Sequence, residues 1–118
     1  MKKKIKTAKS APTEFYVVSW AEKDNESDSL TSGTFMDIYS TARKARNAVM
    51  GVLSADVTLM LSDYGKDEAI ERFGTDDAKE IVKRMVVEDT PGFIKTKHPE
   101  WDSECHYLIT KYSMKYVK

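Results

Sequence analysis

The residues best suited to chemistry are gathered in one short stretch of the sequence. Residues 97–112, KHPEWDSECHYLITKY, contain the only cysteine, Cys105, and both histidines, His98 and His106. The same stretch contains three carboxylates and a tryptophan. Thiol, imidazole and carboxylate groups could together form a metal site or a nucleophilic site, or the stretch could be a turn that leads into a strand.

A metal site is the first of these alternatives. A structural zinc site takes four ligands, usually Cys and His, and the whole chain has three such residues. Cys105 and His106 are adjacent on a predicted strand, so their side chains should leave opposite faces. His98 with the neighbouring carboxylates would form only a weak site. We therefore expect no metal and no other cofactor.

A cysteine nucleophile is the second alternative, and it needs a nearby base and donors for an oxyanion. His106 should point away from Cys105, and His98 could act as the base only if the turn folds back. No glycine-rich turn or helix start lies beside Cys105 to lower its pKa. We interpret Cys105 as a small apolar residue in a strand, after a turn at His98-Pro99 in which Trp101 packs against the sheet.

We find no other catalytic motif in the sequence. The sequence has no GxxxxGK[ST] and no GxGxxG, because its five glycines are scattered. The carboxylate pairs 67–68 and 76–77 fall at predicted helix starts, where acids favour the helix dipole. The acidic loop 24–28 offers oxygen atoms but lacks the glycine and the glutamate spacing of a calcium loop. We expect that the protein is not an enzyme.

The composition is that of one ordinary globular domain. A chain of 118 residues is about one domain long, and 41% apolar with 32% charged residues at zero net charge argues against overall disorder. No apolar run approaches the roughly 18 residues of a membrane span. The basic start has no apolar stretch after it and so is not a secretory signal. A single cysteine fits a reducing compartment, and we expect a cytoplasmic protein.

Hydrophobic patterning predicts an α+β fold. Residues 14–22, EFYVVSWAE, are rich in aromatic and β-branched residues and form the clearest strand. Further strands are expected near 34–39 and 104–116, and helices near 41–63, 66–73 and 76–86. This order predicts a small antiparallel sheet with the helices packed on one face. Residues 1–13 are expected to be a disordered basic tail, and residues 14–118 a single domain.

Local signals set the expected ends of the helices. Ser40 is the expected N-cap of the first helix, which could break or restart after Gly51. Gly65 and Gly74 suit helix ends, and Thr75 or Asp76 could cap the third helix. The segment 85–88, MVVE, could instead begin a strand, and DTPG at 89–92 predicts a turn.

The strand pattern predicts which side chains share a face. On the first strand Phe15, Val17 and Ser19 should point one way, and Tyr16, Val18 and Trp20 the other. On the last strand Tyr107 and Ile109 should face one way, opposite to Leu108, Tyr112, Met114 and Tyr116.

Exposed aromatic residues indicate a protein-binding role. If one face of the sheet stays open, aromatic residues there would form an apolar patch with a lysine rim, which is typical of a partner site. The expected contact residues are Tyr16, Trp20, Trp101, Tyr112 and Tyr116. The S-T-x-x-K-A helix start, the strand pair and the charged loops are similar in kind to small accessory proteins carried by phages and plasmids. We expect a regulator or inhibitor that binds another protein, with self-association as a further expectation.

Nucleic-acid binding is the alternative function. It would use a basic tail and a basic face of the first helix, formed by Lys2, Lys3, Lys4, Lys6, Arg43, Lys44 and Arg46. The zero net charge of the chain argues against a dedicated nucleic-acid binder.

Overall fold

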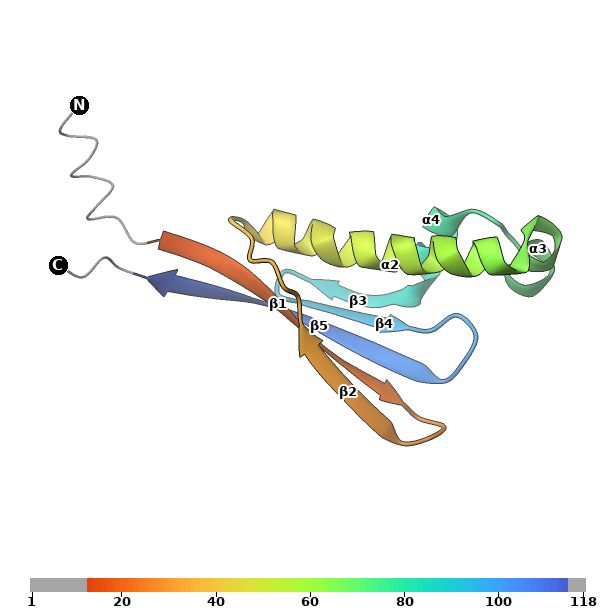
Figure 1. Cartoon of the computed structure of the whole chain (residues 1–118), viewed down its shortest axis with the longest axis horizontal. Coiled ribbons are helices and arrows are strands. Elements are labelled where there is room, and N and C mark those ends of the chain that lie inside the picture. The colour runs from red at the N-terminus through yellow and green to blue at the C-terminus, as the bar shows by residue number, and fades with distance from the viewer. Residues whose placement is uncertain (1–12, 115–118) are drawn as a thin grey trace, which may run out of the picture.

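The computed structural model describes residues 13–114, which form a five-stranded antiparallel sheet with helices on one face (Figure 1). The predicted α+β class is therefore confirmed. The strand order is β2-β1-β5-β4-β3. The strands are β1 (Thr13–Asp24), β2 (Ser29–Thr34), β3 (Val86–Thr90), β4 (Phe93–Lys97) and β5 (Ser103–Met114). The helices are α2 (Ala42–Tyr64), α3 (Lys66–Phe73) and α4 (Ala78–Met85).

The pairing of β1 with β5 is the longest in the sheet. Each strand has twelve residues, and the register runs without a break from Thr13↔Met114 to Asp24↔Ser103. β2 pairs only with residues 19–24 of β1, and β4 only with residues 104–108 of β5. The other ends of β1 and β5 therefore extend as a two-stranded ribbon beyond the rest of the sheet, as Figure 1 shows.

The first helix begins one residue later than Ser40 would place it. Thr41 is the N-cap, and its Oγ1 accepts a hydrogen bond of 3.1 Å from the backbone N–H of Lys44. The helix continues through Gly51 without a break. Its buried residues recur every four positions, as one stripe facing the sheet: Ala45, Val49, Leu53 and Val57.

Glycines end the first two helices as predicted. Gly65 and Gly74 both have positive φ, which a residue without Cβ adopts at little cost. The third helix is capped by Asp77 and not by Thr75 or Asp76, because the Asp77 side chain accepts from the N–H of Lys79. This helix leads directly into β3.

Two parts of the strand prediction were wrong. The second strand was expected near 34–39 but occupies residues 29–34, and the segment 35–39 contributes only the bridge Tyr39↔Tyr16. Ser and Thr dominate β2, and the left-handed Asp28 (φ 56°) makes its connection to β1 tight. The strand that could begin within MVVE is present as β3, but β4 and its hairpin with β3 were not predicted, although the turn at Pro91-Gly92 lies within the predicted DTPG turn.

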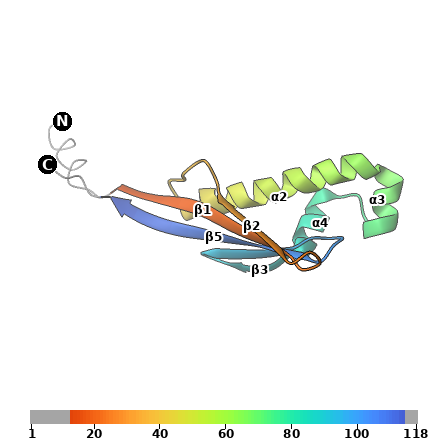
Figure 2. The same ribbon diagram turned by 60° about the horizontal axis from the view of Figure 1, so that its bottom comes forward.

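The hydrophobic core lies between the helices and one face of the sheet (Figure 2). Val18, Ile94 and Tyr107 come from the central strands and are almost completely buried. They contact the stripe of α2 and three residues of α4, Ile81, Val82 and Met85. Side chains alternate along each strand, so half of them point to the other face of the sheet, which no helix of the described residues covers.

The expected tail, residues 1–13, lies almost wholly outside the described residues, since only Thr13 is included, as the first residue of β1. Within residues 13–114 no helix is both long enough and apolar enough to cross a membrane.

The surroundings of Gly33 and Gly51 predict that replacing each glycine by alanine changes the free energy of unfolding in opposite directions. A Cβ at Gly33 would lie 2.8 Å from Cζ2 of Trp20, so we expect Gly33→Ala to lower the free energy of unfolding by about 1–3 kcal/mol. Gly51 has open space around it within α2, so Gly51→Ala should raise that free energy by about 0.5–1 kcal/mol. Urea denaturation measures both, and an unchanged midpoint for Gly33→Ala would contradict the close approach of Trp20.

Candidate functional site

A cavity of about 440 Å³ opens between α2 and the end of the sheet that includes the loop at residues 98–102. β1, α2, α4, β4 and β5 also contribute to its lining. Its apolar lining comes from the inner side of the helices, with Leu53, Val57, Met60 and Met85. A volume of this size lies within the range of small-molecule sites in proteins.

His98 and Trp101 form one wall of the cavity, and their rings stack at a centroid distance of 3.9 Å. The Nδ1 atom of His98 accepts hydrogen bonds from the backbone N–H groups of Glu100 (3.0 Å) and Trp101 (3.3 Å). The prediction that Trp101 packs against the sheet was wrong, because its ring stacks on the imidazole of His98 and remains 53% exposed.

Cys105 and His98 line the same cavity, but their ionisation does not suit a nucleophile and its base. Burial raises the pKa of the Cys105 thiol, and the charge of Glu22 raises it further. Burial lowers the pKa of His98. An activated cysteine needs the opposite, a thiolate stabilised by a nearby cation. The arrangement holds both groups neutral.

His106 lies on the other face of the strand, as the sequence predicted. Its ring makes an edge contact with Phe93 at 5.3 Å, on the side of the sheet that no helix covers. Within residues 13–114 no three His, Cys, Asp or Glu side chains are grouped so that they could hold a metal ion.

Acidic side chains dominate the charge of the cavity. Its lining includes Glu22 of β1, Asp56 and Asp63 of α2, and Glu100 of the loop, and it includes no lysine or arginine. Burial raises the pKa of the Tyr107 hydroxyl far above its usual range; the hydrogen bond with Cys105 and the charges of Asp56 and Glu22 act in the same direction. The field inside the cavity is therefore negative.

Glu100 is the one cavity carboxylate that is paired within the described part of the chain. It accepts from the Tyr64 hydroxyl and, at 2.8 Å, from Nη1 of Arg72. The Arg72 guanidinium also lies 4.4 Å from the centre of the Tyr64 ring and 2.9 Å from Glu68. The rim of the cavity thus holds a cation between carboxylates and an aromatic ring.

The structure distributes the expected partner residues over different surfaces. Tyr16 and Trp20 are on the helix-covered face and pack against the core. Trp101 lies at the cavity, and Tyr112 lies on the face without helices. Tyr116 is outside the described residues. These aromatic residues do not form one surface.

The face without helices carries a different apolar surface, which we call the helix-free patch. Phe15 and Tyr112 are paired across β1 and β5, and their rings stack at 5.6 Å. Leu108 and Tyr112 are about half exposed, at 50% and 48%. The patch consists of Phe15, Val17, Phe93, Leu108, Tyr112 and Met114. Lysines of β1 and β4 lie beyond it on the same face: Lys23, Lys95 and Lys97.

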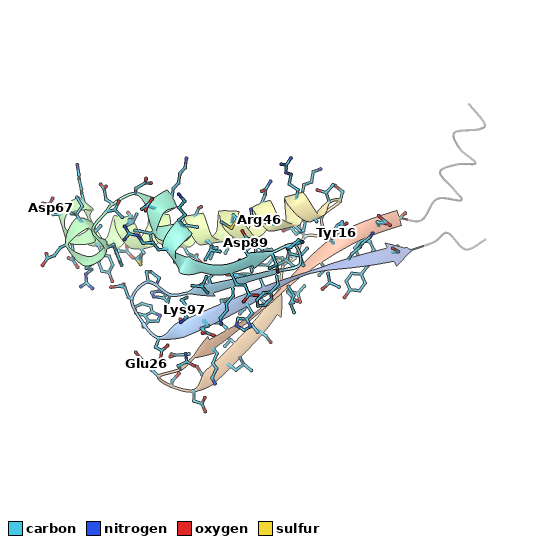
Figure 3. All side chains as sticks on the ribbon, turned by 180° about the vertical axis from the view of Figure 1, so that it is seen from behind. Tyr16, Glu26, Arg46, Asp67, Asp89 and Lys97 are labelled. Atoms are coloured by element: carbon cyan, nitrogen blue, oxygen red, sulfur yellow. The ribbon has the colours of Figure 1, made fainter. Side chains whose placement is uncertain are left out.

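The basic helix face of the alternative function is partly neutralised. Arg46 forms an ion pair with Asp89 of β3, and Figure 3 shows the two residues side by side. Arg43 and Lys44 are exposed on α2. The tail residues Lys2, Lys3, Lys4 and Lys6 lie outside the described part of the chain.

Comparisons with known protein families, with curated proteins and with solved structures find no match to this chain. Sequence reasoning missed Glu22, Asp56 and Asp63 at the cavity. A signal was present for α2, since Asp56, Met60 and Asp63 are spaced by four and three residues and so share one side of the helix.

The raised pKa of the Cys105 thiol predicts that it reacts slowly with disulfide reagents. We expect the native thiol to react with a disulfide reagent near pH 8 about tenfold more slowly than the same thiol in denaturant, because a raised pKa reduces the thiolate fraction. The measurement is the rate of thiol release over a range of pH. A native rate equal to the denatured rate would show that the thiol is not held neutral.

The lowered pKa of His98 predicts a pH dependence of stability. The unfolded chain binds a proton at this position near pH 6.5, and the folded protein binds it only at lower pH. Stability from this group is therefore complete above about pH 7 and falls as the pH drops through 6.5.

The matched variant is His98→Asn, whose side-chain oxygen can still accept from the N–H groups of Glu100 and Trp101 but does not titrate. Thermal unfolding between about pH 7.5 and 5.5 should show a larger decrease of Tm in the natural protein than in the variant. Parallel decreases would mean that His98 does not contribute.

Proposed function

We propose that this protein is a non-enzymatic binding module that regulates or inhibits another protein through the helix-free patch. The observation that supports this most is the stack of the partly buried Phe15 with the half-exposed Tyr112 on a sheet face that no helix covers. Large apolar and aromatic side chains gathered on such a face usually mark a site for a partner.

The chemistry of the patch fits a protein partner. Tyrosine gives a large rigid contact area at low entropic cost, and aromatic residues are enriched among those that carry binding energy. Leu108 and Met114 extend the apolar surface along β5 on either side of Tyr112. Lys23 and Lys95 form ion pairs with Asp28 and Glu104, so any attraction of a partner with an acidic rim would come mainly from Lys97 and would mainly raise the rate of association.

The ionisation of the cavity supports a role without catalysis. Burial raises the pKa of the Cys105 thiol, so the thiol is not activated for nucleophilic attack near pH 7, and the lowered pKa of His98 makes it a weaker base. A single cysteine also fits a reducing compartment, and we propose the cytoplasm as the location. An accessory protein of a phage or plasmid would suit such a role.

Nucleic-acid binding is the second candidate, and the exposed Arg43 and Lys44 favour it. The ion pair of Arg46 with Asp89 weighs against it, because a paired guanidinium attracts a phosphate less strongly. Nucleic-acid binding would also fall steeply with salt, whereas binding through the apolar patch would not.

The test compares matched variants in a tagged pull-down from the source cells, with and without nuclease treatment. Tyr112→Asp should reduce capture of the partner about thirtyfold, the loss expected for an aromatic residue that contributes about 2 kcal/mol. Met36→Asp is the control, because Met36 is 99% exposed and is not one of the patch residues. Circular dichroism should show that both variants remain folded.

A stoichiometric protein that is captured by the natural chain and by Met36→Asp but lost with Tyr112→Asp is the expected result. Equal capture by both variants would contradict binding through the patch. Recovery of nucleic acid alone, lost after nuclease, would replace this proposal with the basic tail and helix. Recovery of a second copy of the chain alone, lost with Tyr112→Asp, would replace the foreign partner with self-association.

A further inference from the structure

We propose that the cavity beside α2 binds a small organic cation, an ammonium or guanidinium group attached to an apolar body. The cavity and the helix-free patch lie on opposite faces of the sheet, so this inference does not rest on the proposed function. It rests on the size, the apolar lining and the unpaired carboxylates of the cavity.

The apolar lining would hold the body of the ligand. Leu53, Val57, Met60 and Met85 form a continuous lining from α2 and α4, and the Trp101 ring is available at one wall. Methionine side chains adapt to irregular ligands, and an exposed indole can cover a flat or aliphatic group. A cavity of about 440 Å³ can enclose a molecule of this kind.

The carboxylates would select a positive charge. Within residues 13–114 the cavity residues Glu22, Asp56 and Asp63 have no ion-pair partner, although Glu100 has Arg72. No lysine or arginine lines the cavity, and His98 is held neutral by burial. An incoming cation would therefore meet several negative charges and no cationic side chain in the lining, and the Arg72 charge at the rim is offset by Glu68 and Glu100, while an anion would be repelled.

Arg72 shows the mode of recognition within the chain itself. Its guanidinium bonds to Glu100 and lies over the ring of Tyr64 at the rim of the same cavity. Glu22 and Asp56 are solvent-exposed carboxylates at the cavity, close enough to Tyr107 for their charges to act on its hydroxyl. A bare metal ion fits less well, because no three candidate ligands within residues 13–114 are grouped.

The experiment is a calorimetric and NMR titration with three probes of equal size and different charge. The probes are 4-phenylbutylamine, 4-phenylbutanol and 4-phenylbutanoate. We expect the amine to bind at least tenfold more tightly than the alcohol, and the carboxylate to bind most weakly. The amide signals that shift should come from α2, from the loop at 98–102 and from β5 near Cys105.

Matched variants separate the cavity from general charge attraction. Glu22→Gln and Asp56→Asn should each weaken amine binding about fivefold without changing alcohol binding, because both replace a charge by an amide of the same shape. Glu88→Gln on β3 changes the net charge equally and does not line the cavity, so it should leave amine binding unchanged.

Equal binding of the amine and the alcohol would overturn the proposal by showing an apolar cavity without charge selection. An equal loss in Glu88→Gln would overturn it by showing attraction to the whole surface. No binding of any probe at millimolar concentration would also overturn it.

Discussion

The register between β1 and β5 is the constraint on which the rest of the structure depends. The two strands pair over twelve residues, and β2 and β4 pair directly with them. Because side chains alternate along a strand, a slip of one residue would move each side chain of the slipped strand to the opposite face. A slipped β1 would take Val18 out of the core and turn Phe15 toward the helices, and a slipped β5 would do the same to Tyr107 and Tyr112. Both candidate binding surfaces thus depend on one register.

Helices on only one face of the sheet give the protein two chemically different surfaces. On the covered side, Val57 is the last buried residue of α2. Around this part of the helix, acidic side chains and the 98–102 loop line a cavity. On the other side, the aromatic pair of Phe15 and Tyr112 stays in contact with solvent. Our two proposals assign a small cation to the first surface and a protein to the second.

Much of the fold could be predicted, because its strongest local signals agree with the tertiary structure. The alternation in residues 14–22 and in β5 predicted the faces of both central strands, and the spacing of Ala45, Val49 and Leu53 predicted α2. β2 was missed because its serines and threonines give no alternation, and it forms only by pairing with β1. The cavity was missed because Glu22 and Asp56 meet through tertiary contacts between a strand and a helix.

Hydroxyl-radical footprinting with mass spectrometry tests the central register most directly, since it reports the exposure of single side chains. On β5 the register predicts rapid oxidation of Tyr112 and protection of Tyr107, which is only 7% exposed. The two tyrosines point to opposite faces of β5, so their oxidation rates should differ strongly. Equal reactivity of the two tyrosines, or protection of Tyr112 with oxidation of Tyr107, would contradict the register and with it both proposed binding surfaces.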